Sequence, residues 1–212
     1  MVRRHGHDPV LFGYIDQTRD PRATAGDDPW VATFEGVLPG FRADARGGVM
    51  LDRVGQPCRD WLVGRGVAVP AKLEDLFLPD PALYPDPGAQ PTLDPPRFGA
   101  AETETAFLVD RFLAYLEGRV GAPWFAHMSF LRPHPPFCVP APYNGLFHPA
   151  DMPAPTRRPS VRDESRQNPF LAALLDVNPA FHFIVNATGP AAAFDLADVA
   201  LLRAIYFAMI AE

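Results

Sequence analysis

The apolar segment from Trp124 to Leu131 runs directly into a proline-rich loop, Arg132 to Phe137. Because both faces of the segment are largely apolar, the pattern predicts a strand that is buried on both sides, as in the parallel sheet of an α/β protein. The prolines of the loop have no amide hydrogen to donate and fix their own φ angles, so the strand must end there. Ligands of open α/β sheets gather at the carboxyl ends of strands, which makes His134 our first candidate for a functional side chain. The alternative is that His134 only hydrogen-bonds a neighbouring carbonyl.

Other segments with clear periodicity support an α/β fold. A strand is expected over residues 8–14 and a short helix over residues 59–69. Residues 101–116 carry the apolar spacing of a helix that Thr103 opens and Gly118 ends, and this helix leads into the strand before His134. A helix followed by such a strand is the αβ half of a doubly wound unit. Asp195 is expected to begin a last helix over residues 196–212.

Composition narrows the classes of partner. The 212 residues carry a formal charge of −6, which gives no basic surface for nucleic acid. We find no apolar run long enough to span a membrane and no signal-peptide pattern, so a cytoplasmic location without membrane partners is expected. The 26 prolines predict long, ordered loops, because apolar residues stay plentiful between them. Cys58 and Cys138 are too few for a disulfide framework or a zinc site.

The loop around His134 resembles a family signature. The stretch Pro133 to Phe137 is similar to the Pro-His-x-Pro-Phe sequence of the sulfatase and phosphonate monoester hydrolase group of the alkaline phosphatase superfamily. The resemblance implies that His134 contacts the sulfuryl or phosphoryl group, or its leaving oxygen. It also implies an alkaline phosphatase-like domain with a mostly parallel sheet, flanking helices and long proline-rich loops.

A second segment resembles the same group. Gly13 to Asp16, followed by Asp20 to Arg22, is similar to the phosphonate monoester hydrolase branch rather than to the Gly-Lys-Trp-His of conventional sulfatases. The resemblance places Tyr14 and Asp16 in contact with substrate. A tyrosine and a carboxylate in place of lysine and histidine favour a singly charged diester or phosphonate over a dianion. Without the resemblance, Tyr14 would equally suit a strand-end residue that covers the core.

The resemblance also shows what is missing. The family uses a divalent metal ion (calcium, manganese or zinc) and a nucleophile from a Cys-x-Pro-x-Arg type motif. The residues around Cys58 do not reproduce that motif, and no metal-ligand segment is found. We therefore expect residues 1–212 to be a single, incomplete sulfatase-like catalytic domain, an internal piece of a longer hydrolase that lacks the N-terminal nucleophile part and the C-terminal metal-ligand part.

Two function classes remain open. In the first, the intact protein hydrolyses small anionic sulfate, phosphonate or phosphodiester esters with the help of its metal ion, relatives form homo-oligomers, and the chain alone holds no metal and is inactive. In the second, the chain is a non-catalytic binding or interaction protein derived from the same fold. Reading the coding DNA on both sides of this frame would separate them, because only the first class requires nucleophile and metal-ligand segments nearby.

Overall fold

The computed structural model describes residues 2–13, 15, 20, 22–23, 40–45, 56–80, 82 and 90–212. Contacts separate the chain into two compact units. Unit 1 is Met1–Val69 with Ala101–Leu131, and unit 2 is Pro70–Ala100 with Arg132–Glu212. The single domain that the sequence predicts over residues 1–212 stays a prediction.

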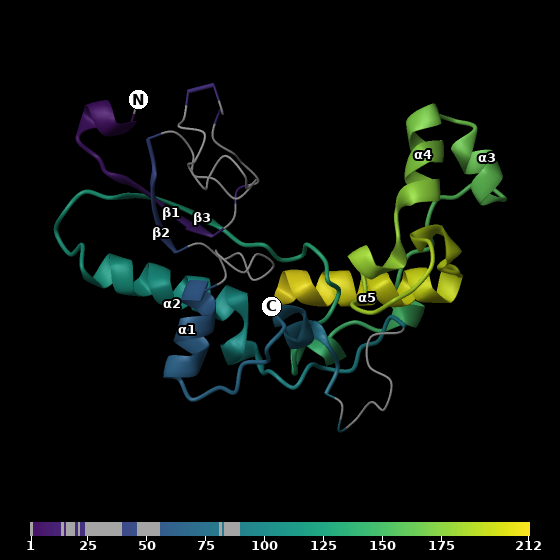
Figure 1. Cartoon of the computed structure of the whole chain (residues 1–212), viewed down its shortest axis with the longest axis horizontal. Helices are drawn as coiled ribbons and strands as arrows, with labels where there is room; N and C mark the ends of the chain where they lie inside the picture. Colours follow the sequence, from purple (N-terminus) through teal and green to yellow (C-terminus); the bar gives the residue numbers. More distant parts are fainter. Residues whose placement is uncertain are drawn as a thin grey trace. The chain divides into compact units, whose positions relative to one another are not determined.

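The described elements combine strands and helices, as an α/β chain requires (Figure 1). The strands and the α-helices are β1 (Pro9–Gly13), β2 (Arg42–Ala45), α1 (Gln56–Gly64), α2 (Glu104–Glu117), β3 (Phe125–Ser129), α3 (Val161–Ser165), α4 (Pro169–Val177) and α5 (Leu196–Ala211). Short 3-10 helices cover Val2–His5, Leu73–Phe77, Ala100–Glu102, Tyr143–Gly145, Pro149–Asp151, Ala180–His182 and Ala191–Ala193.

Unit 1 is built on a parallel sheet whose described strands have the order β2-β1-β3. The central strand is β1, and each of its five residues is buried. Burial on both faces suits the uninterrupted apolar run Val10–Leu11–Phe12. Helix α2 lies along the sheet in contact with β1 and β2 (Figure 1).

The prediction of a strand after residue 124 is confirmed, but the prediction that it is buried on both sides is wrong. Along β3 every residue is exposed or only partly buried, and Phe125 is 39% exposed. The physical reason is position, because β3 is an edge strand of the described sheet and β1, with neighbours on both sides, takes the centre. The strand with every residue buried is β1, not the strand predicted within residues 124–131.

Helix α2 fixes the position of β1 through aromatic contacts. The Thr103 side chain accepts a hydrogen bond from the amide of Ala106, which satisfies one of the open donors at the helix start. The ring of Phe12 then meets the rings of Phe112 and Tyr115 edge-on, each at 5.4 Å between centroids. The predicted helix and its cap are thus confirmed.

The packing core of unit 2 is formed around α5. Asp195 and Asp198 form a reciprocal capping box at the start of this helix, as the sequence predicts for Asp195. Ile205, Ala208 and Met209 are buried on the helix face that packs against Val139. The proline-rich segment after the histidine loop is therefore anchored on α5.

Arg132 organises the loop that begins unit 2. Its guanidinium donates hydrogen bonds to the carbonyls of Pro136 and Cys138, at 3.3 and 2.9 Å. Its Nε lies 3.8 Å from a carboxylate oxygen of Glu212, and the two side chains are only 13% and 2% exposed. The cation also stands 5.4 Å from the ring centre of Phe77. One largely covered arginine thus ties the loop to the end of α5.

None of the helices in the described ranges combines the length and apolar character that crossing a membrane requires.

Gly13 provides a test of the sheet packing. Its φ is +91°, and a Cβ added there would stand 1.9 Å from the carbonyl oxygen of Ser129 on β3. We expect Gly13→Ala to lower the free energy of unfolding by about 3 kcal/mol, because the clash adds to the strain of a positive φ. Urea unfolding followed by circular dichroism measures the loss.

The matched control for this change is Gly66→Ala. Gly66 also has a positive φ, +78°, but no atom lies within 4 Å of its added Cβ. This variant should lose only about 1 kcal/mol, the cost of the backbone strain alone. Equal losses in the two variants would show that the approach of Gly13 to Ser129 does not limit this position.

The charge pair of unit 2 provides a second test. We expect Arg132→Met to lower the free energy of unfolding by about 3 kcal/mol, because it removes the positive charge that faces a buried carboxylate. The double variant Arg132→Met with Glu212→Gln should recover part of this loss, since the carboxylate charge is removed as well. Thermal unfolding measures the stability of both variants. A double variant that is less stable than the single variant would contradict the pairing of Arg132 with Glu212.

Candidate functional site

His134 lies in the loop at the start of unit 2, with its side chain exposed. Its Nδ1 lies 2.6 Å from the carbonyl oxygen of Pro135. A carbonyl oxygen can only accept a hydrogen bond, so Nδ1 carries the proton of this contact. The structure thus contains the hydrogen bond to a neighbouring carbonyl that the sequence analysis gave as the alternative role of His134, but this bond uses only Nδ1. The other, Nε2, makes no hydrogen bond with the described residues and can meet a ligand.

The loop that carries His134 is held on both sides of the histidine. Arg132 binds two of the loop carbonyls, as described above. Beyond the histidine, the amide of Phe137 donates to the carbonyl of Phe183 at 2.7 Å, and the Phe137 ring packs against those of Phe183 and Tyr206. These contacts hold the loop in place in addition to the fixed φ angles of its prolines.

The other two predicted site residues cannot be placed beside His134. Tyr14 and Asp16 lie outside the described residues, so their contact with substrate stays a prediction from sequence. The residue before them is described, and it shows where the segment starts. Gly13 ends β1 directly opposite Ser129, the last residue of β3. The segments that contain Tyr14 and His134 thus follow neighbouring parallel strands.

Beyond Asp16, the side chains of Asp20 and Arg22 form an ion pair. Arg22 donates from Nε and Nη2 to the two carboxylate oxygens of Asp20, each at 2.9 Å. These hydrogen bonds hold the pKa of the Asp20 carboxyl below its usual value. A guanidinium engaged at two positions by a carboxylate is poorly available for an anionic substrate.

Neither cysteine has the environment of a nucleophile. Both thiols are buried. Burial, with the nearby charge of Glu104, raises the pKa of the Cys58 thiol to about 12. Burial likewise raises the pKa of the Cys138 thiol to about 12, although the charge of Arg132 opposes the shift. Because the thiolate is the reactive form, this supports the expectation that Cys58 is not the nucleophile.

Metal ligands do not gather in the described part of the chain. Among those residues, no group of three or more histidine, cysteine, aspartate and glutamate side chains is arranged to hold an ion. The described residues therefore do not fit the ligand set of the family's metal ion.

Sequence reasoning missed two features of unit 2. The first is the set of contacts made by Arg132, two residues before the histidine. A single arginine beside a proline does not indicate in the sequence that its side chain binds two carbonyls and a distant carboxylate. The second is a cavity of about 910 Å³ in unit 2, lined by parts of residues 155–199. One sequence signal for the α4 wall of this cavity was the pair Asn168 and Pro169, because asparagine is a common N-cap and proline is common in the first turn of a helix.

Comparison with known proteins agrees with the fold. No protein-family model matches the chain. The multifunctional alkaline phosphatase superfamily protein PehA of Trinickia caryophylli is 34% identical over 211 residues, which is 100% of this chain and 40% of PehA. The crystal structure of the phosphonate monoester hydrolase of Agrobacterium radiobacter has a TM-score of 0.87 and 40% identity, and covers 99% of this chain and 40% of that one.

A second solved structure gives the same result. The phosphonate monoester hydrolase of Silicibacter pomeroyi has a TM-score of 0.82 and 32% identity, covering 98% of this chain and 39% of its own. The resemblance of the Gly13 and His134 segments thus extends along the whole chain, and the chain spans about 40% of the length of the relatives that it matches. The chain is homologous to phosphonate monoester hydrolases and to alkaline phosphatase superfamily proteins, and it has their α/β fold.

Proposed function

We propose that this chain supplies the part of a phosphonate monoester hydrolase that contacts the transferred group, with His134 as the contact. The observation that carries the proposal is the geometry of the His134 ring, whose Nδ1–H is held by the Pro135 carbonyl and whose Nε2 is left for a ligand. Homology over the whole chain supports the reaction class, since the relatives include phosphonate monoester hydrolases. The substrate class is a small anionic ester.

The chemistry of His134 depends on its charge. As an imidazolium it carries a proton on Nε2 and donates a charge-assisted hydrogen bond to a phosphonyl oxygen or to the leaving oxygen. Either contact stabilises the negative charge that develops on oxygen when the ester bond breaks. By resemblance, Tyr14 and Asp16 complete the substrate contacts, and the absence of lysine and histidine at those positions favours a singly charged ester.

Enzymes of the superfamily are generally metal-dependent, and calcium, manganese or zinc is the ion expected by resemblance. The described residues provide no ligand set for it, so its ligands are proposed to lie elsewhere in the intact hydrolase. The homo-oligomeric state expected of intact relatives and the cytoplasmic location stay predictions from sequence.

The first test measures turnover and binding on the same protein. We expect no hydrolysis of an aryl sulfate, a phosphonate monoester or a phosphodiester by this chain, with or without added manganese or zinc, because His134 alone supplies neither nucleophile nor metal. We also expect phenylphosphonate to shift the ring-nitrogen signals of His134 in an NMR titration, with weak, millimolar-range affinity. Hydrolysis that disappears in His134→Ala would contradict the proposal that catalysis needs further residues.

His148 is the internal control for the titration. Its Nδ1 accepts a hydrogen bond from the amide of Ala150 at 3.2 Å, so its neutral ring carries the proton on Nε2, the reverse of His134. The two rings should thus show opposite tautomers before any ligand is added. Phenylphosphonate that moves both rings equally, or only His148, would overturn the assignment of His134 as the contact.

The buried thiols give a second test, which concerns the nucleophile. At pH 8 neither Cys58 nor Cys138 should react with a thiol reagent in the folded chain, because both pKa values are about 12, and both should react after unfolding. The unfolded thiols titrate near their ordinary pKa of 9.0, so the free energy of unfolding should fall as pH rises from about 9 towards 12. Fast labelling of Cys58 in the folded chain would reopen its role as nucleophile.

A further inference from the structure

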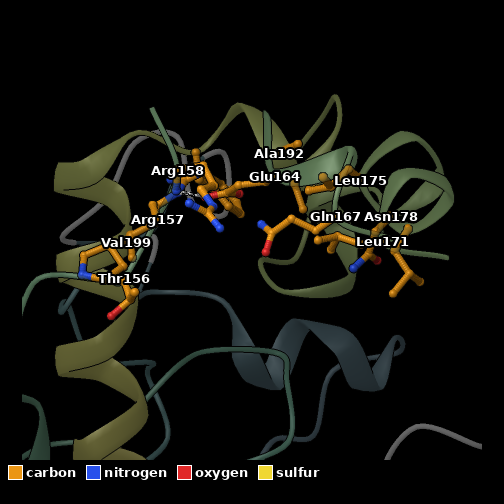
Figure 2. A pocket seen from close by; sticks show the side chains of 14 residues that line it. Thr156, Arg157, Arg158, Glu164, Gln167, Leu171, Leu175, Asn178, Ala192 and Val199 are labelled. Atoms are coloured by element: carbon orange, nitrogen blue, oxygen red, sulfur yellow. Dashed lines mark hydrogen bonds and ion pairs between the residues drawn. The ribbon is translucent and has the colours of Figure 1, made fainter. Parts of the chain in front are cut away.

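Unit 2 contains a cavity that the proposed function does not use. Its volume is about 910 Å³, within the range typical of small-molecule sites. The walls come from separate segments of the unit: the extended stretch 155–158, the α3–α4 pair, residues 191–194 and the first turn of α5. Figure 2 shows these side chains around the opening.

One end of the cavity is basic. Arg157 and Arg158 lie there together with Thr156 and Val199 (Figure 2). Glu164 accepts a hydrogen bond from Nε of Arg157 at 3.3 Å and another from the backbone amide of Arg158 at 3.0 Å. The single carboxylate is therefore used by Arg157 and by the backbone. Within the described part of the chain, the Arg158 guanidinium has no hydrogen bond or ion pair, so none of those residues compensates its charge at the cavity.

The other end is mainly apolar, with Asn178 as a polar residue beside the leucines (Figure 2). Leu171, Leu174 and Leu175 of α4 line it, and Leu171 and Leu175 are seen at the side opposite the arginines in Figure 2. Between the two ends, the side-chain amide of Gln167 projects into the cavity (Figure 2). The lining therefore changes from charged at one end to mainly apolar at the other.

We propose that this cavity binds an amphipathic carboxylate, a molecule with one carboxylate group and a linear hydrocarbon body. The carboxylate would accept hydrogen bonds from the Arg158 guanidinium, whose planar fork of donors matches the two oxygens. The Gln167 amide would donate to the same group. The hydrocarbon body would lie against the leucines of α4, where it loses contact with water. This site is separate from the proposed hydrolase contact at His134 and does not depend on it.

Charge and shape favour such a ligand over a second copy of the chain. Phe170 and Val177 of α4 lie outside the cavity lining and are 69% and 70% exposed, and these exposed apolar side chains suit a protein partner better than the cavity does. The cavity is concave, and among the residues described around it only the Arg158 charge is uncompensated, which suits a ligand with a single anionic head group. A second copy of the chain could fill the cavity only by inserting from its own surface a carboxylate and a neighbouring apolar side chain.

The test is isothermal titration calorimetry of this chain with decanoate, below the concentration at which decanoate forms micelles. We expect saturable binding with one decanoate per chain. Decanol keeps the body without the charge, and acetate keeps the charge without the body, so each should bind at least tenfold more weakly. Equal binding of decanol, or no saturable binding of decanoate, would overturn the proposal.

Variants locate the bound head group. Arg158→Ala should weaken decanoate binding about tenfold, and Arg158→Lys, which keeps the charge, should recover part of it. The matched control is Arg162→Ala, since Arg162 is an exposed arginine of α3 outside the cavity lining, and it should change binding less than twofold. Equal weakening by Arg158→Ala and Arg162→Ala would refute the site.

Sedimentation velocity on the same samples tests the second-copy alternative. If the chain dimerises without ligand, and Arg158→Ala both separates the dimer and leaves decanoate binding unchanged, a second copy fills the cavity and the proposal is wrong. A monomer that binds decanoate with the ligand and variant preferences given above supports it.

Discussion

The guanidinium of Arg132 supports the segment on which the candidate site depends. The loop from Arg132 to Phe137 contains three prolines, which can donate no backbone hydrogen bonds. A loop of this kind cannot be fixed by the usual backbone ladder, so a side chain must supply the donors. Arg132 does this by binding the carbonyls of Pro136 and Cys138. Because a buried charge is costly unless it is compensated, the carboxylate of Glu212 is as necessary to the arrangement as the carbonyls are.

Much of the fold follows from local sequence signals. Helices α2 and α5 were predicted because Thr103 and Asp195 are strong caps and the apolar spacing behind them is regular. The burial of β3 was predicted wrongly, since the neighbours of a strand in a sheet are set by distant parts of the chain. Helix α4 was missed for another reason. It is apolar on nearly all sides, so its sequence has no clear polar face from which a helix could be recognised.

The site was less predictable than the fold. His134 became a candidate because it follows a predicted strand of an α/β sheet, but this position left open the alternative that it only hydrogen-bonds a neighbouring carbonyl. The resemblance of its loop to a family signature then implied a contact with the transferred group. The role of Arg132 depends on Glu212 and Phe77, which are far away in the sequence, and no periodicity reports such a contact. Tyr14 and Asp16 rest on the resemblance alone. The chain matches about 40% of each relative, which agrees with a proposal of contact residues without a gathered metal-ligand set among the described residues.

The hydrogen bond between His134 and Pro135 also limits how protons can pass through this residue. A histidine with two accessible nitrogens can take up a proton at one and release it at the other, as in a relay. In His134 the Nδ1–H is directed at the carbonyl oxygen of the next residue, 2.6 Å away. Protons can then enter and leave only at Nε2, the same nitrogen that we propose as the ligand contact. The ring can serve as an acid or as a base for whatever is bound there, but a bound ligand closes its only route of exchange with water.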